Sequence, residues 1–89
     1  MVAIVALVHG APGAYGVSFP DFPGCIAGGE TVDEALRRGR DALDFHVESM
    51  IEVGEPLPTM RDIAEIRADP EYVDDLADAL VAVTEASDG

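Results

Sequence analysis

The sequence contains no lysine, and its five basic side chains are all arginines. Against them stand 18 acidic side chains in 89 residues, which gives a net charge of −13. A protein that holds nucleic acid through its phosphates needs clustered lysine and arginine, so we expect no direct nucleic-acid binding. The acidity either serves solubility or attracts a basic protein partner at a high association rate.

Cysteine and long apolar runs are also scarce. Cys25 is the only cysteine, which excludes an intrachain disulfide and fits a reducing cytoplasm. No stretch reaches the roughly 18–20 apolar residues of a membrane span. The apolar residues 1–8 lack a positively charged start and run directly into glycine and proline, so they predict a strand rather than a signal peptide. We expect a cytoplasmic protein without membrane contact.

Patterns that carry catalysis or bind cofactors are missing as well. The chain has no C-x-x-C or H-x-x-x-H pair and no glycine-rich phosphate loop, so we expect no metal and no other cofactor. Asp21 is the one acid within residues 1–29, whereas a two-metal nuclease needs several converging carboxylates. His9 is expected in a surface loop, His46 in the core or an interface, and Cys25 as a small buried hydrophobe. A Cys25–His46 nucleophile pair is conceivable, but neither residue has an obvious orienting group. We therefore expect no enzyme.

The length predicts one domain over residues 1–89, with a modest core. Residues 2–8, 14–19 and 25–30 have strand character, and their short connections favour an antiparallel meander. Pro20 and Pro23 exclude an interior strand or helix, so residues 19–24 predict a rigid turn. We expect Asp21 to be structural there, accepting a backbone N–H within the turn.

A long helix is predicted over residues 32–53. Thr31 and Glu34 form a capping-box pattern before it, and Gly54 followed by Pro56 ends it. Its expected apolar stripe consists of Val32, Ala35, Leu36, Gly39, Ala42, Leu43, His46, Val47, Met50 and Val53. Gly39 on this stripe indicates close contact with the sheet. Phe45 and Ile51 lie off the stripe, either as exposed apolar scatter or as a second contact face.

The remainder predicts a helical turn over residues 59–66, a second one begun by Asp69 and Pro70, and a last strand over residues 79–84. The expected fold class is α+β, in the order β-β-β-α-β, with one long helix on one face of a small mixed sheet. Exposed edges of so small a sheet favour a homodimer or a higher oligomer.

Several of these motifs, taken in order, resemble the HicB-type antitoxin family. Tyr15 in a strand precedes FPDFPGC at residues 19–25, then a Gly28–Gly29 turn and TVDEAL at residues 31–36. Residues 54–58 match the family's later G-x-x-[IL]-P segment. The motif residues carrying the resemblance are Tyr15, Phe19, Pro20, Asp21, Pro23, Gly24, Thr31 and Glu34. The resemblance implies a degenerate RNase H-like fold.

The resemblance also implies an antitoxin of a type II toxin–antitoxin system, which binds and neutralises a small basic HicA-like ribonuclease through an acidic surface. Candidate partner-binding acids are Asp33, Asp41, Asp44, Glu48 and Glu52, with Asp74, Asp75 and Asp78 as a second group. The alternative is an orphan HicB-like module that oligomerises or binds another protein or ligand, and a residual nuclease using Asp21 is a third reading. Many family members add a DNA-binding domain, which residues 59–89 do not resemble, so autorepression stays open.

Overall fold

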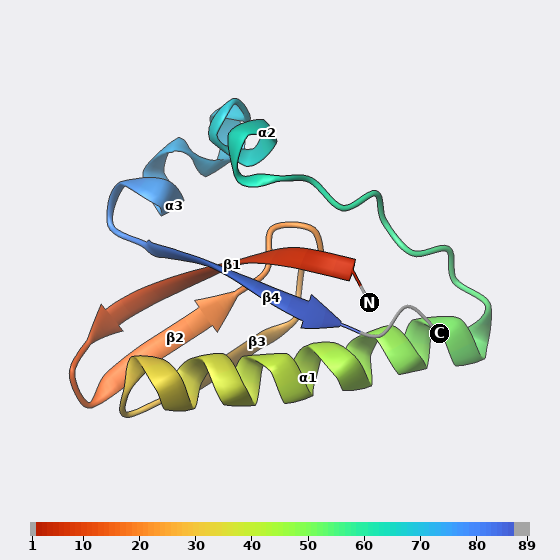
Figure 1. The fold of residues 1–89 in the computed structure, drawn as a ribbon, viewed down its shortest axis with the longest axis horizontal. Coiled ribbons are helices and arrows are strands. Elements are labelled where there is room, and N and C mark those ends of the chain that lie inside the picture. The colour runs from red at the N-terminus through yellow and green to blue at the C-terminus, as the bar shows by residue number, and fades with distance from the viewer. Residues whose placement is uncertain (1, 87–89) are drawn as a thin grey trace.

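The computed structural model of the protein describes residues 2–86. The elements follow the predicted α+β order, with three strands, a long helix, a series of short helical turns and a last strand (Figure 1). They are β1 (Val2–Ala11), β2 (Ala14–Ser18), β3 (Ile26–Gly29), α1 (Val32–Val53), α2 (Ile63–Arg67), η1 (Pro70–Tyr72), α3 (Val73–Ala77) and β4 (Leu80–Ala86).

The four strands form one sheet in the order β3-β2-β1-β4, and all three pairings are antiparallel. The predicted meander of the first three strands is confirmed, but the predicted mixed sheet is wrong. A helix alone would return the chain to the start of a strand parallel to β1. Instead residues 55–79, which we call the strap, cross the length of the sheet once more before β4 begins (Figure 1). Therefore β4 enters from the opposite end.

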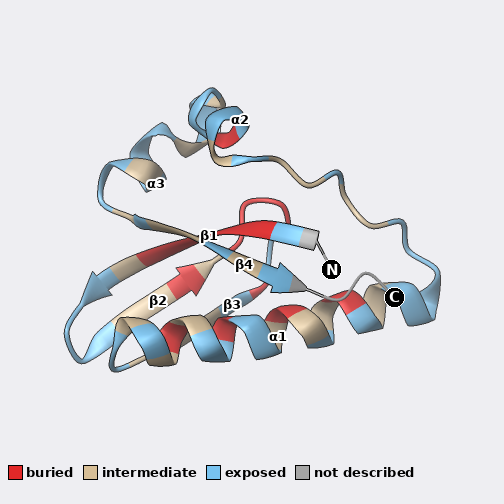
Figure 2. Ribbon diagram, in the orientation of Figure 1, coloured by how far each residue is buried: buried red, intermediate tan, exposed pale blue. Residues whose placement is uncertain are grey.

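β1 lies at the centre of the molecule, between α1 on one face of the sheet and the strap on the other. Five consecutive side chains, residues 4–8, are buried, as the near-continuous apolar run predicts for a strand covered on both faces (Figure 2). The strand extends beyond the predicted end to Ala11. His9 therefore lies within β1, paired with Gly16, and not in a surface loop. The predicted second and third strands are slightly shorter in the structure.

The bounds of α1 match the prediction because both ends carry the expected caps. The Thr31 hydroxyl accepts a hydrogen bond from the Glu34 N–H at 3.1 Å. The Glu34 carboxylate accepts from the N–H of Glu30 at 3.1 Å, one residue earlier than a reciprocal capping box requires. At the other end Gly54 has a φ of 80°. Its N–H donates to the Ile51 carbonyl, and the next N–H to the Met50 carbonyl, which is the Schellman pattern.

One face of α1 packs on the sheet through Ala35, Gly39, Leu43 and Val47, all buried. A Cβ on Gly39 would lie 2.6 Å from Val17 Cγ1, so the predicted close contact between helix and sheet is confirmed.

Three further residues were predicted to lie in or near the contact between α1 and the sheet, and one of these predictions is wrong. His46 lies half-buried, edge-to-face with Phe22 at a centroid distance of 6.0 Å. Cys25 is buried as predicted, and its burial raises the pKa of the thiol. Val53 is wrongly predicted on the stripe. It is 70% exposed, because α1 runs past the end of the sheet (Figure 1).

The strap covers the other face of the sheet with a smaller apolar cluster. Ile66 is fully buried and packs with Val5 and Leu7. The predicted helical turns are present: α2 begins after Asp62, and Asp69 caps η1 with Pro70 in its first turn. The last strand is confirmed as β4, shifted slightly towards the C-terminus. Within residues 2–86, no helix combines the length and apolar character needed to cross a bilayer.

Candidate functional site

The proline-bracketed segment between β2 and β3 forms two successive turns. The N–H of Phe22 donates to the Phe19 carbonyl at 3.0 Å, and that of Cys25 to the Phe22 carbonyl at 3.1 Å. Gly24 has a φ of 90°, which a residue with a side chain rarely adopts. Phe19 and Phe22 point into the core and are buried. The predicted rigid turn is thus confirmed, and its aromatic side chains anchor it.

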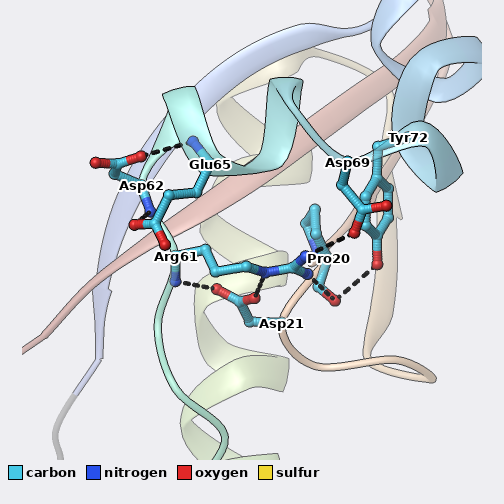
Figure 3. A network of polar contacts seen from close by, with 7 residues as sticks. All are labelled: Pro20, Asp21, Arg61, Asp62, Glu65, Asp69 and Tyr72. Atoms are coloured by element: carbon cyan, nitrogen blue, oxygen red, sulfur yellow. Dashed lines mark hydrogen bonds and ion pairs between the residues drawn. The ribbon is translucent and has the colours of Figure 1, made fainter.

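Asp21, at the tip of this turn, accepts two hydrogen bonds from one residue of the strap. The backbone N–H of Arg61 donates to Asp21 Oδ2 at 2.8 Å, and its Nε donates to Oδ1 at 2.7 Å (Figure 3). Asp21 is buried, so its charge is compensated where water cannot reach it. The structural role predicted for Asp21 is supported, but its partner lies 40 residues away instead of within the turn.

The Arg61 guanidinium has further partners beyond Asp21. Its Nη1 donates to Asp69 Oδ2 at 2.9 Å, and its carbon lies 5.3 Å from the centre of the Tyr72 ring. The Tyr72 hydroxyl donates to the Pro20 carbonyl at 3.1 Å (Figure 3). The hydrogen bond to Asp21 is the main cause that raises the pKa of Arg61 above its usual value. We call these five residues the Arg61 network, and it fastens the strap to the turn.

The family-motif residues named above therefore serve the framework of the fold. Pro20 and Asp21 belong to the Arg61 network, Phe19 and the half-buried Tyr15 pack in or against the core, and Gly24 shapes the turn. Thr31 and Glu34 begin α1, and Pro23 is exposed. The structure does not bring these residues together into one site.

Arg61 and Tyr72 were not singled out by sequence reasoning. A signal for Arg61 was present, because it is the only cation between Arg40 and Arg67 in a strongly acidic chain. A buried aspartate needs such a partner.

A different group of side chains gathers on the outer side of α1, near its C-terminal end. Asp44, Glu48 and Glu52 follow one another at every fourth position and line a groove together with Phe45 and Ile51. Phe45 is 72% exposed and Ile51 44% exposed. We call these five residues the acidic groove. The two apolar residues that lie off the core stripe thus share one surface with acids.

The charge in the acidic groove lacks compensation within the helix. Arginines occur only in the N-terminal half of α1, where Arg38 lies 3.5 Å from Glu34. The last turn carries no basic residue, although the C-terminal end of a helix has a partial negative charge that favours cations. Acids gathered there repel one another, and they also interact unfavourably with the negative end of the helix dipole. A cationic partner would relieve both repulsions.

The predicted partner-binding acids separate into three places. Asp44, Glu48 and Glu52 lie in the acidic groove, and Asp41 is exposed on the preceding turn. Asp33 lies in the first turn of α1, at the opposite end of the helix, where its negative charge interacts favourably with the positive end of the helix dipole. The second group, Asp74, Asp75 and Asp78, is exposed on or directly after α3. Among residues 2–86 there is no group of three or more His, Cys, Asp or Glu side chains that could hold a metal ion.

Comparisons with known proteins agree on one family. The family described as HicB-like antitoxin of bacterial toxin–antitoxin systems matches residues 3–87. The N-terminal domain of the Burkholderia pseudomallei antitoxin HicB is similar in structure, with a TM-score of 0.79 and 38% identity over 97% of this chain and 99% of that domain. A chain of the HicA3–HicB3 toxin–antitoxin complex shares the fold, with a TM-score of 0.74 and 21% identity over 97% of this chain and 99% of that one.

A curated relative is an uncharacterized 14.9 kDa protein of Haemophilus phage HP1, 43% identical over 60 residues. The match covers 67% of this chain and 45% of that protein, so the chain spans less than half of the relative's length. The prediction of a single domain over residues 1–89 stays a prediction. The fold and the family match together confirm the resemblance found in the sequence, and the chain belongs to the HicB-like antitoxin family.

Proposed function

We propose that this protein is the antitoxin of a toxin–antitoxin pair, and that it neutralises a small basic HicA-like ribonuclease by binding it. It acts through binding and not through catalysis, and it does so in the cytoplasm, where such a toxin meets its RNA. The observation that carries the proposal is the acidic groove on α1. The match of a HicB-like antitoxin family to residues 3–87 and the fold shared with a chain of the HicA3–HicB3 complex support it.

The acidic groove has the two components that protein interfaces combine. Phe45 offers an exposed aromatic ring, the side-chain type that most often dominates binding energy. Asp44, Glu48 and Glu52 surround it with negative charge, which attracts a basic partner and orients it on approach. Because a ribonuclease holds RNA through basic residues, a protein that presents carboxylates in place of phosphates competes for the same surface.

A catalytic role has little support in this chain. Asp21, the acid in the turn of the family motif, is buried and already accepts two hydrogen bonds from Arg61. A carboxylate used in this way is not free to coordinate a metal ion or to activate water. RNA cleavage by the purified protein that Asp21→Asn abolishes would contradict this part of the proposal.

The test has two steps. Tagged protein is first used to capture a HicA-like toxin whose gene lies beside its own. Growth of cells that express this toxin is then measured with and without co-expression of the protein. We expect the wild type to bind the toxin at low salt, to bind it less at high salt, and to restore growth. The double variant Asp44→Lys/Glu48→Lys should weaken binding by a factor of at least 100, since it replaces attraction by repulsion. The variant Glu30→Lys/Glu71→Lys is the matched control, because it makes the same change in net charge at two exposed acids outside both groups of candidate partner-binding acids.

Equal losses in both variants would show that only the overall charge matters, and the acidic groove would then not be the binding surface. If the wild type captures no basic protein from its native cytoplasm, the antitoxin proposal is wrong for this chain. The alternative from the sequence, an orphan HicB-like module that oligomerises or binds another ligand, would then hold.

A further inference from the structure

The chain has five cations, all of them arginines, and three of these have structural roles. Arg61 is the centre of the Arg61 network. Arg38 lies 3.5 Å from a carboxylate oxygen of Glu34 and donates to the Gly28 carbonyl, also at 3.5 Å, so it connects α1 with β3. Arg67 ends α2, where a cation interacts favourably with the negative end of the helix dipole. Two arginines are left without such a role.

These two arginines are Arg37 and Arg40, and both are exposed on α1. Each has an aspartate four positions later in the helix, at Asp41 and Asp44. Among the residues that the structure describes, however, neither arginine makes an ion pair. An arginine placed before its aspartate is also the weaker order for a pair of this spacing. Stabilisation of α1 therefore explains the two arginines poorly.

Both arginines lie beside the acidic groove and on the same side of the helix as its residues. A helix advances about 1.5 Å per residue, so Arg40 lies about 6 Å along α1 from Asp44, and Arg37 lies about 10 Å from it. Positions eleven apart are separated by about three full turns and are therefore almost in line. Arg37 is in line with Glu48 in this way. Arg40 is likewise in line with Ile51. The outer surface of α1 thus carries cations over one stretch, and acids with apolar residues over the next.

A partner that covers the acidic groove also reaches these arginines. A protein interface of standard size covers about 800 Å² on each side, which corresponds to a patch roughly 30 Å across. Centred on Glu48, such a patch extends about 15 Å in each direction, whereas Arg40 lies about 12 Å along the helix and Arg37 about 16 Å. Arg40 therefore falls inside the contact, and Arg37 falls at its rim. A partner that presents only cations would place like charges against both of them.

We propose that Arg37 and Arg40 determine the orientation and specificity of toxin binding, by pairing with one or more carboxylates that the toxin carries beside its basic surface. Arginine suits this role, because its guanidinium forms paired hydrogen bonds with a carboxylate and is enriched in protein interfaces. In a reversed orientation, or with a toxin that lacks the carboxylate, the two arginines meet cations and weaken the complex. This inference rests on the proposed function and adds the chemistry of the partner beside the acidic groove.

The test measures binding of the full chain to the toxin encoded beside its gene, by surface plasmon resonance. Arg40→Glu should raise the Kd at least tenfold, and Arg37→Glu should raise it less. Each substitution makes an acidic protein more acidic, so the overall attraction to a basic toxin increases. The association rate should therefore rise, and the dissociation rate should rise more. Arg67→Glu is the matched control, because it makes the same change in net charge on the face of the sheet opposite α1 (Figure 1). This control should bind at least as tightly as the wild type.

Charge reversal on the toxin tests the pairing separately from the fold of the antitoxin. Each aspartate and glutamate of the toxin is replaced in turn by arginine, and its binding to the wild type and to Arg37→Glu/Arg40→Glu is measured. One replacement should weaken binding to the wild type and strengthen binding to the double variant. A change in the fold of the antitoxin cannot produce this compensation. The neutral variant Arg37→Gln/Arg40→Gln should lose less affinity than the Glu variant and keep the urea midpoint of the wild type.

Three outcomes would overturn this inference alone. They are an Arg40→Glu variant that binds as tightly as Arg67→Glu, a set of toxin replacements none of which compensates, and a loss of affinity in the neutral variant that follows a lower urea midpoint. In each case the toxin still binds the wild type, so the proposed function stands. If the wild type captures no toxin, the proposed function fails and this inference fails with it. The two failures are therefore distinguishable.

Discussion

The two faces of the sheet are covered in different ways. On one face α1 is a single helix of 22 residues, which buries Ala35, Gly39, Leu43 and Val47 against a large apolar cluster. On the other face the strap buries Ile66 in a cluster that, among residues 2–86, contains two further buried residues, and the Arg61 network fastens the strap. The first cover depends on apolar area spread over many positions. The second depends on a few polar contacts around one side chain.

This difference predicts two levels of stability in one small domain. Apolar packing between α1 and the sheet forms or is lost with the fold as a whole, because its contacts support one another. A segment with little buried area and a few anchoring contacts can open on its own at a lower free energy. We therefore expect α1 to present the acidic groove rigidly, whereas the strap opens locally before the domain unfolds.

The largest expected effect is on the α1 face. Leu43 is fully buried in the large cluster, and Leu43→Ala removes that packing and leaves a cavity. The free energy of unfolding should fall by about 2–5 kcal/mol, measured by urea denaturation. Val53→Ala, on the same helix but 70% exposed, should change it by less than about 0.5 kcal/mol. Alanine is the better helix former at both positions, so helix propensity causes no loss in either variant. Similar losses would therefore mean that burial against the sheet is not what holds α1.

The next effect tests the strap. Arg61→Ala removes the guanidinium charge and its Nε hydrogen bond from the buried Asp21 carboxylate, which keeps only the bond from the backbone N–H of residue 61. The loss of this charged hydrogen bond should cost about 2–3 kcal/mol. Hydrogen exchange should accelerate mainly in residues 60–79 and much less in α1. Arg67→Ala removes the same charge from an exposed position of α2 and is the control, expected to leave both exchange and stability nearly unchanged. If Arg61→Ala accelerates exchange equally in α1, the two faces form one cooperative unit and the comparison is wrong.

The same contrast explains what the sequence could and could not predict. The bounds of α1 follow from local signals, namely Thr31 before the helix, Gly54 after it and an apolar residue every three or four positions. The Arg61 network joins Asp21 to a residue 40 positions away, and no local pattern specifies that pairing. The direction of β4 depends on the path of the strap and was wrongly predicted for the same reason.

The acidic groove could be predicted in part, less well than the bounds of α1 and better than the Arg61 network. Its acids were predicted because they occupy the outer face of a recognisable helix, and Phe45 and Ile51 were noticed because they leave the apolar stripe. That these residues line one groove follows from helical geometry, since positions three and four apart are neighbours. Val53 was misplaced because the period of a helix does not reveal where the sheet beneath it ends.

The smallest expected effect compares two helix caps that accept the same helical N–H, one through a hydroxyl and one through a carboxylate. Thr31 accepts a hydrogen bond from the third helical N–H of α1, and Asp62 accepts the equivalent bond in α2 at 2.8 Å. Thr31→Ala and Asp62→Ala each remove one such bond, worth about 1 kcal/mol. Thr31→Ala should lower the global free energy of unfolding by that amount, because α1 is part of the cooperative core. Asp62→Ala should leave the urea midpoint nearly unchanged and accelerate exchange of the α2 amides, since the strap already opens locally. Equal shifts of the urea midpoint would show that the strap unfolds only together with α1. A shift of the urea midpoint in Thr31→Ala alone would show that α1 belongs to the cooperative unit of the sheet and that the strap unfolds separately from it.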